Sequence, residues 1–305
     1  MNKVTVSKIE TYTGHKDSIY TLEKSQFDHI FFSGAGDGMV VSWDLKNPDN
    51  GQLIAKLSNS IYGLHLIESS NILAIGHNYD GVHFIDWVNK KEVGSLKFTE
   101  AAIFDVTSHN NHLCVADADG YLNIIELNPL KVLQKIKVSE KSVRTLAVNA
   151  AKMELAVGTS DHSIIVYNLN DYSVKYKLDD HDNSVFSVCY SPDGELLLSA
   201  GRDAHLKIWD VNAGYLLLED IVAHMYTINN IAFSPDGKHF VTCSMDKSIK
   251  VWDAETFKLL KVIDKARHAG HGTSVNKLLW TGHDNLLISA SDDRSISIWD
   301  IAFDN

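Results

Sequence analysis

The stretch that decides the fold is DAHLKIWD at residues 203–210, because its pattern returns three more times. An Asp followed six residues later by Trp-Asp also occurs in DGMVVSWD at 37–44, DKSIKVWD at 246–253 and DRSISIWD at 293–300. Each Trp also has a His 28 residues before it, and each Asp has a Ser or Thr four residues before it. Four residue types at fixed offsets in four places indicate an internal repeat. The four sets are His15, Ser33, Asp37 and Trp43; His181, Ser199, Asp203 and Trp209; His224, Thr242, Asp246 and Trp252; and His271, Ser289, Asp293 and Trp299.

The same register continues through the middle of the chain with other residues. The anchor positions are 43, 85, 125, 167, 209, 252 and 299, with Ile85, Ile125 and Tyr167 at the Trp position. Seven units account for nearly all 305 residues, which overrules the two domains that length alone suggests. The middle units have Leu57, Lys97 and Ser139 at the His position, and Ile75, Val115 and Val157 at the hydroxyl position. Apolar replacement of a whole polar network can be nearly neutral, so these units need not be weak.

Each unit is predicted to form four short strands. In the fifth unit, SVFSVCYS, ELLLSA and HLKIWDV are separated by the turns PDG and GRD, and a last strand lies near YLLLEDIV. Leu206 and Ile208 face one side of the sheet and Trp209 the other, so both faces are apolar and need a neighbouring sheet. No helical period competes. We therefore expect an all-β protein with one domain over residues 1–305, a seven-bladed β-propeller of four-stranded antiparallel blades.

The two ends of the chain predict how the ring closes. The chain stops at IWDIAFDN, after the third strand of the seventh unit, so that blade lacks its outer strand. Residues 4–12, VTVSKIETY, precede the first unit. We expect them to complete the last blade.

The composition of the chain limits the cellular compartment and the classes of partner that we expect. A formal net charge of −11 argues against a broad surface for nucleic acid or an anionic membrane. Cys114, Cys189 and Cys243 form no CxxC pair and no even-numbered framework, which favours a reducing compartment. MNKVTVSKIE contains no secretory signal, and no run of some eighteen apolar residues predicts a spanning helix. The expectation is a cytoplasmic protein, monomeric on its own, that is the whole gene product and carries no catalytic domain.

These residues give the chain a resemblance to the WD-repeat β-propeller family. The resemblance rests on Gly14-His15 with Trp43-Asp44, on Gly270-His271 with Trp299-Asp300, on the SPDG turns at 191–194 and 234–237, and on the repeated Asp turns. It implies that the four sets of His, Ser or Thr, Asp and Trp named above form hydrogen-bonded clamps within their blades. In such a clamp Asp accepts from the imidazole, and the hydroxyl joins the other ring nitrogen to the indole N–H. The resemblance is nearly silent on activity, because one fold hosts many functions.

Two chemical alternatives are open to these residue types. Ser, His and Asp together suggest a hydrolase, but four copies tied to a Trp, without a GxSxG elbow, favour a structural clamp. Arg267-His268-Ala269-Gly270-His271 suggests a metal site in a long loop, but His271 belongs to a clamp and further ligands at metal spacing are lacking. We therefore predict no catalytic residue, no metal and no cofactor.

The resemblance implies that a partner binds the face that carries the His and Asp turns. In related propellers, such as the β subunit of heterotrimeric G proteins, partners contact positions one, three and five beyond the His and the position before the turn Asp. Position five corresponds here to Tyr20, Tyr62, Ala102, Arg144, Phe186, Asn229 and Asn276. Position one adds Met225, and the position before the Asp adds Arg202 and Met245.

Aromatic, Arg and Met side chains are typical interface anchors. We predict a non-catalytic scaffold that binds a peptide segment or folded domain through Tyr20, Tyr62, Arg144, Phe186, Arg202, Met225, Asn229, Met245 and Asn276. The alternative is a propeller that binds a small molecule, or hydrolyses one, in its central channel. A purely structural interpretation is that the same side chains only line the mouth of the channel.

Overall fold

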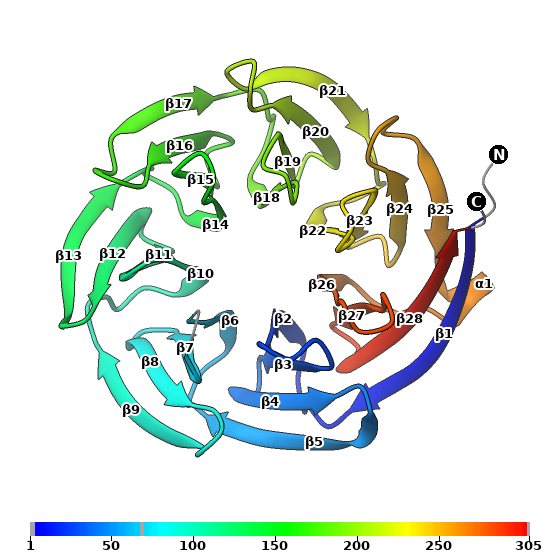
Figure 1. The fold of residues 1–305 in the computed structure, drawn as a ribbon, viewed down its shortest axis with the longest axis horizontal. Helices are drawn as coiled ribbons and strands as arrows, with labels where there is room; N and C mark the ends of the chain where they lie inside the picture. Colours follow the sequence, from blue (N-terminus) through cyan, green and yellow to red (C-terminus); the bar gives the residue numbers. More distant parts are fainter. Residues whose placement is uncertain (1–3, 68–69, 304–305) are drawn as a thin grey trace.

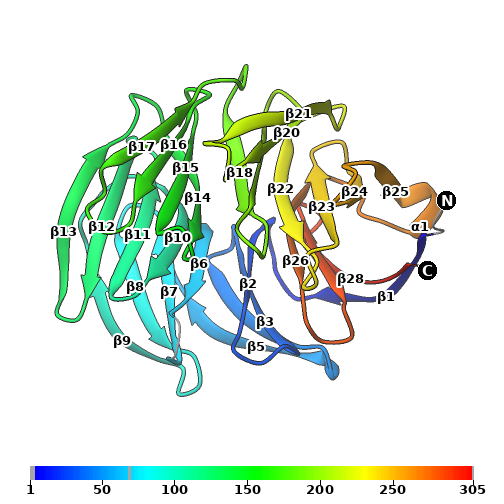
Figure 2. The same cartoon turned by 45° about the horizontal axis from the view of Figure 1, so that its top comes forward.

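The computed structural model describes residues 4–67 and 70–303 as a ring of seven four-stranded antiparallel sheets (Figure 1). In the first six blades the strands follow chain order from the centre of the ring outward. Seen obliquely, the sheets stand side by side around the ring, with turns at both faces (Figure 2). The seven-bladed propeller predicted from the repeat is confirmed.

The first four blades contain the following strands. Blade one consists of β2 (Ile19–Lys24), β3 (Ile30–Ala35), β4 (Met39–Asp44) and β5 (Asn47–Lys56). Blade two consists of β6 (Ile61–Leu66), β7 (Ile72–His77), β8 (Gly81–Asp86) and β9 (Lys91–Leu96). Blade three consists of β10 (Ile103–His109), β11 (His112–Asp117), β12 (Tyr121–Leu127) and β13 (Leu130–Lys137). Blade four consists of β14 (Val143–Asn149), β15 (Glu154–Thr159), β16 (Ile164–Asn168) and β17 (Val174–Leu178).

The last three blades complete the ring. Blade five consists of β18 (Val185–Tyr190), β19 (Leu196–Gly201), β20 (His205–Asp210) and β21 (Leu216–Val222). Blade six consists of β22 (Ile228–Phe233), β23 (His239–Ser244), β24 (Ile249–Asp253) and β25 (Leu259–Ile263). Blade seven consists of β26 (Val275–Trp280), β27 (Leu287–Ser291), β28 (Ser295–Phe303) and, at its outer edge, β1 (Val4–Thr13).

Strand β1 closes the ring, as we predicted from the sequence at the two ends of the chain. It pairs antiparallel with β28 from Val4 opposite Phe303 to Thr13 opposite Ser295. The first described strand thereby covers the edge that the last strand would otherwise leave open (Figure 1). Tyr12 reaches past this pairing and stacks on Trp43 of blade one, with 5.4 Å between the ring centroids.

The core lies between neighbouring sheets, because each sheet buries both of its faces. Trp209 of blade five packs with Ile164 and Val166 of blade four. Leu206 and Ile208, on the opposite face of the same strand, pack with blade six, including Ile228 and Trp252. This arrangement confirms the two-sided burial predicted from the alternation in LKIWD.

Local turn chemistry fixes the hairpins at the SPDG segments. Ser191 Oγ accepts a hydrogen bond from the backbone N–H of Leu196 at 2.9 Å, and Asp193 Oδ1 accepts from the N–H of Glu195 at 3.0 Å. Gly194 adopts φ 72°, a conformation that favours glycine. The second SPDG turn, at 234–237, repeats these contacts.

One helix differs from the sequence expectation. The loop before blade seven contains α1 (Lys265–His268), a single helical turn that Asp264 caps by accepting from the N–H of Arg267. No helical period predicted it, because one turn is too short to show one. In the part of the chain that is described, no helix is long and apolar enough to cross a membrane.

Candidate interaction surface at the channel mouth

A β-bulge at the start of every innermost strand builds the mouth of the central channel. In each blade the pairing between the first two strands shifts register after the first residue of the innermost strand, so that its second residue is the extra one. The seven extra residues line a single hollow of about 210 Å³. They are Tyr20, Tyr62, Phe104, Arg144, Phe186, Asn229 and Asn276.

Side chains from five neighbouring blades form a continuous arc on one side of this mouth. The rings of Tyr20 and Tyr62 lie 4.6 Å apart, and those of Tyr62 and Phe104 lie 5.8 Å apart. The guanidinium of Arg144 lies 4.1 Å from the ring centroid of Phe104 and 5.3 Å from that of Phe186. We call these five side chains, Tyr20, Tyr62, Phe104, Arg144 and Phe186, the aromatic arc.

The cation of Arg144 is held in place from several directions. Its Nε donates to Ser160 Oγ at 2.8 Å. Burial lowers the pKa of Arg144, Tyr62 acts in the opposite direction, and the positive charge of Arg202 lowers it further. An arginine nevertheless stays charged, so the mouth carries a fixed positive charge that Arg202 reinforces.

The other side of the mouth is polar and ties blades together. Asn229 Nδ2 donates to Ser274 Oγ at 2.9 Å and to the carbonyl of Val275 at 2.8 Å, which joins blade six to blade seven. Asn276 Nδ2 donates to the carbonyl of Ile19 at 3.0 Å and to Asp292 Oδ1 at 2.8 Å, which joins blade seven to blade one. The side-chain amides of Asn229 and Asn276 therefore connect neighbouring blades.

The assignment of Ala102 to this ring was wrong, and Phe104 takes the place. The first hairpin of blade three, from Val106 to its partner Val115, is two residues shorter than the hairpin from Leu64 to its partner Ile75. The loop between β9 and β10 is correspondingly two residues longer than the loop between β5 and β6. Counting back from Ile125 therefore gives a position two residues before the correct one in β10. For the same reason Thr99, rather than Lys97, stands at the His position of blade three. The signal that finds Phe104 is the apolar pair Ile103 and Val106, which has the spacing of Ile61 and Leu64.

Two of the expected residues extend the surface over blade six. Met225 is 82 % exposed and Met245 is 58 % exposed. Their loops lie together, since the N–H of Met245 donates to the carbonyl of Thr227 at 2.9 Å. Tyr226, which the repeat register did not single out, is 60 % exposed beside them. We call Met225, Tyr226 and Met245 the blade-six patch.

The four clamps contain the hydrogen bonds that the resemblance implied. In blade five, Trp209 Nε1 donates to Ser199 Oγ at 2.9 Å, and Ser199 Oγ lies 2.8 Å from His181 Nε2. His181 Nδ1 lies 2.7 Å from Asp203 Oδ2. Blades one, six and seven repeat the chain through Ser33, Thr242 and Ser289. All four hydroxyl-bearing residues are completely buried, so no substrate can reach them.

The clamp lowers the pKa of its carboxylate. For Asp246, burial acts to raise the pKa, but the hydrogen bonds from His224 and Ser248 and the charge of His224 hold it well below the usual range. Burial also lowers the pKa of His224, although Asp246 acts against this. In the clamp of blade six, the carboxylate of Asp246 is therefore ionised at neutral pH.

Polar side chains beneath the mouth connect one blade to the next. Asp105 Oδ2 accepts from the N–H of Leu146 in blade four at 2.8 Å. Ser187 Oγ accepts from the N–H of Ile231 in blade six at 3.1 Å, and Asn230 Oδ1 from the N–H of Leu278 in blade seven at 3.0 Å. Asp105 and Asn230 line a channel of about 790 Å³, which also contains Glu23, His65 and Lys277.

The channel therefore holds acidic groups that the sequence analysis did not expect there. Burial raises the pKa of Asp105, while Lys277 and the N–H donors of Leu146 and Val106 act to lower it. Both oxygens of Asp105 accept from backbone N–H groups. Such a carboxylate is engaged in holding blades together.

Comparison with known proteins agrees with this architecture. The family described as "WD domain, G-beta repeat" matches residues 6–44, 172–210, 217–253 and 262–300, which together are half of the chain. The chain belongs to the WD-repeat family. The matched segments contain the three inner strands of each blade that carries a clamp, whereas blade two, blade three and β14–β16 of blade four lie outside them.

Several curated proteins are similar to the chain over most of its length. Periodic tryptophan protein 2 of Saccharomyces cerevisiae is 25 % identical over 209 residues, 68 % of this chain and 21 % of the relative. The striatin homolog of Dictyostelium discoideum is 22 % identical over 256 residues, 72 % of this chain and 31 % of the relative. WD repeat-containing protein SL1-17 of Schistosoma mansoni is 32 % identical over 210 residues, 69 % of this chain and 56 % of the relative. The chain thus spans less than a third of the first two relatives.

Proposed function

We propose that the chain is a non-catalytic scaffold that binds a protein partner on the face bearing the channel mouth. The aromatic arc is the observation that carries this proposal. Tyr, Phe, Arg and Met dominate it and the blade-six patch, and these types supply most of the binding energy at protein interfaces. We place this activity in the cytoplasm and expect a monomer in the absence of the partner.

The arc is pre-organised for binding. Arg144 is held between Phe104 and Phe186 and by Ser160 before any partner arrives. A side chain that is already fixed loses little conformational freedom on binding, so more of the contact energy appears as affinity.

The chemistry of the arc indicates what the partner presents. The rings offer apolar surface, while Arg144 and Arg202 add positive charge on a chain whose formal net charge is −11. We infer that the partner inserts an apolar side chain next to a carboxylate. The guanidinium can form charge-assisted hydrogen bonds with such a group.

The polar groups of the channel favour this proposal over the channel-based alternative. Asp105, Ser187 and Asn230 use their oxygens to accept from the backbone of the next blade. A small-molecule or hydrolytic site would need carboxylates or hydroxyls free to meet a substrate. The same side chains are here interblade connections.

The test is capture of partners from the native cell followed by a direct binding measurement. Arg202→Glu, Tyr62→Ala and a Met225→Ala, Met245→Ala double variant should each weaken binding at least tenfold without lowering the thermal midpoint by more than about 3 °C. Lys258→Glu is the matched control, because Lys258 is exposed in the turn between β24 and β25, at the opposite end of blade six. Unchanged binding by all three variants would overturn the assignment of this face.

A further inference from the structure

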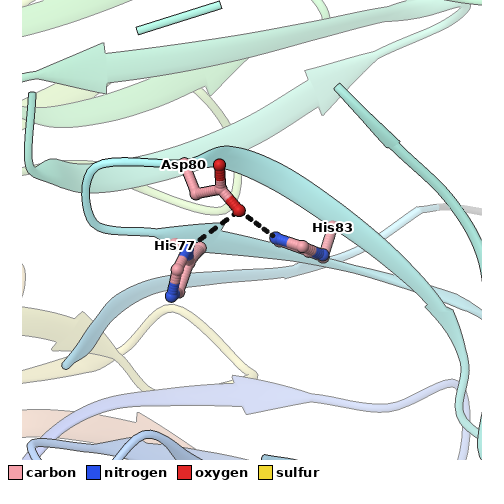
Figure 3. A group of neighbouring side chains, drawn as sticks. All are labelled: His77, Asp80 and His83. Atoms are coloured by element: carbon pink, nitrogen blue, oxygen red, sulfur yellow. Dashed lines mark ion pairs between the residues drawn. The ribbon is translucent and has the colours of Figure 1, made fainter. Parts of the chain in front are cut away.

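The hairpin between β7 and β8 of blade two brings two histidines and an aspartate together (Figure 3). His77 is the last residue of β7, Asp80 lies in the turn, and His83 is in β8. Ile75 and His83 are directly opposed in this pair, so His77 and His83 lie diagonally on one face of the hairpin. The sequence HNYDGVH therefore brings the side chains of His77, Asp80 and His83 together at one point.

The distances suit a metal ion better than hydrogen bonds. Asp80 Oδ2 lies 3.8 Å from His77 Nδ1 and 3.7 Å from His83 Nε2, both too long for hydrogen bonds. One ligand atom from each residue lies within 4.8 Å of the other two. Zinc held tetrahedrally by bonds of 2.0–2.1 Å places its ligand atoms about 3.4 Å apart. A shift of a few tenths of an ångström closes this difference for the two distances from Asp80 Oδ2.

Each histidine turns one ring nitrogen toward Asp80, and neither nitrogen has a hydrogen-bond partner in the described part of the chain. His77 Nδ1 and His83 Nε2 are buried and make no hydrogen bond among the described residues, and Figure 3 shows both rings directed at the Asp80 carboxylate. Leaving a buried nitrogen unpaired costs free energy, so most such groups in proteins have a partner. Two of them aimed at one carboxylate indicate that something belongs between them.

The outer ring nitrogens are fixed in the way that metal-binding histidines require. His83 Nδ1 lies 2.9 Å from Glu92 Oε1, which as a carboxylate only accepts, so this nitrogen carries the proton and Nε2 presents its lone pair. His77 Nε2 lies 3.1 Å from Ser58 Oγ, to which it can donate, leaving the Nδ1 lone pair free. Carboxylates and hydroxyls behind the ligands orient them and raise their basicity.

Blade two has no clamp, so the carboxylate of Asp80 is not needed to bind a clamp histidine. In the clamp-bearing blades the turn Asp bonds the His of the preceding loop, as Asp37 bonds His15. Blade two has Tyr79 at that turn position and Leu57 at the His position. Asp80, one residue later, instead faces the two histidines of its own hairpin, while Lys97 Nζ lies 3.5 Å from its other oxygen, Oδ1.

We propose that His77 Nδ1, Asp80 Oδ2 and His83 Nε2 bind a divalent transition-metal ion, with zinc as the favoured ion. Imidazole and carboxylate are ligands that zinc takes readily. Three protein ligands leave a fourth position for water or for a group from outside. The turn also touches the channel mouth, since Asn78 Oδ1 accepts from the N–H of Ile103, the residue before Phe104 of the aromatic arc. The site does not depend on the proposed function.

The probe is zinc itself, titrated into the chelator-treated 305-residue chain in competition with a chromophoric chelator. We expect one tight equivalent. His83→Gln and Asp80→Asn should weaken it more than 100-fold, and Glu92→Gln, which removes only the orienting carboxylate, by about 10–100-fold. The matched control is His205→Gln, because His205 pairs with Asp220 on the surface of blade five without a third ligand, and it should bind as the unaltered chain does.

A second measurement separates a bound ion from a folding defect. Zinc should raise the thermal midpoint of the unaltered chain and leave that of Asp80→Asn where it was, because only a ligand of the folded state stabilises it. Asp80 is half-exposed, so this variant is expected to fold. Absence of a tight equivalent in the unaltered chain, or full affinity in both ligand variants, would overturn the proposal.

Discussion

The guanidinium carbon of Arg144 lies 4.1 Å from the centroid of the Phe104 ring, within the range of a cation–π interaction. The two residues occupy equivalent bulge positions in blades four and three. Their contact therefore joins neighbouring blades at the channel mouth, and it also positions the charge that we propose a partner recognises.

The first prediction concerns the coupling between these two residues. A double-mutant cycle of Phe104→Ala and Arg144→Ala, read by denaturant unfolding, should give an interaction energy of about 0.5–2 kcal/mol. The same cycle with Phe104→Ala and Arg202→Ala should give close to zero, since Arg202 stacks on no ring among the described residues. Equal interaction energies in the two cycles would show that the stacking of Arg144 on Phe104 does not contribute to the free energy of unfolding.

The clamp of blade five gives the second prediction. Ser199→Ala removes the hydroxyl that joins Trp209 Nε1 to His181 Nε2, and leaves both groups buried without that partner. We expect a loss of about 1–3 kcal/mol in the free energy of unfolding. Ser173→Ala is the control, because Ser173 is exposed and bonds only locally to Asp171, and it should change stability by less than about 0.5 kcal/mol. A clamp variant as stable as this control would mean that the hydrogen bonds are not stabilising.

The third prediction is a dependence of stability on acid. The pKa of Asp246 is lower in the folded chain than the unfolded value of about 3.9, so its contribution is complete above about pH 4 and is lost as the pH falls through the folded pKa. Asp246→Asn removes this group from the titration. Unfolding free energies measured between neutral pH and about pH 2 should then fall less steeply below pH 4, by up to about 1.4 kcal/mol per pH unit. Parallel curves for the two proteins would contradict the lowered pKa.

Much of this architecture could be predicted because its determinants lie at fixed offsets. Trp209, Asp203, Ser199 and His181 belong to one blade and repeat with the same spacing three more times, so blade number and ring closure follow by counting. The β-bulge is also uniform, which is why most of the mouth residues were found by register.

The remaining features depend on relations that counting does not reveal. Phe104 was missed because a hairpin shortened by two residues and a loop lengthened by two shift the strand within an otherwise normal unit. The hydrogen bond from Leu278 N–H to Asn230 Oδ1 joins residues 48 apart in different blades, and nothing in either segment marks the partner. In blade two, His77 and His83 converge only because the turn between them is tight, and Glu92 joins them from the next strand.

The last prediction tests the closure of the ring. Tyr12 of β1 is 4 % exposed and stacks on Trp43 and on Phe31, with 6.2 Å between the ring centroids of Tyr12 and Phe31. Removing a buried aromatic ring costs about 3–5 kcal/mol, so Tyr12→Ala should lower the free energy of unfolding by that amount and free the N-terminal segment for proteolysis. Ile9→Ala is the matched control on the same strand, because Ile9 is 54 % exposed, and it should stay within about 0.5 kcal/mol of the unaltered chain. If the two variants were equally stable, β1 would not be the element that locks blade seven to blade one.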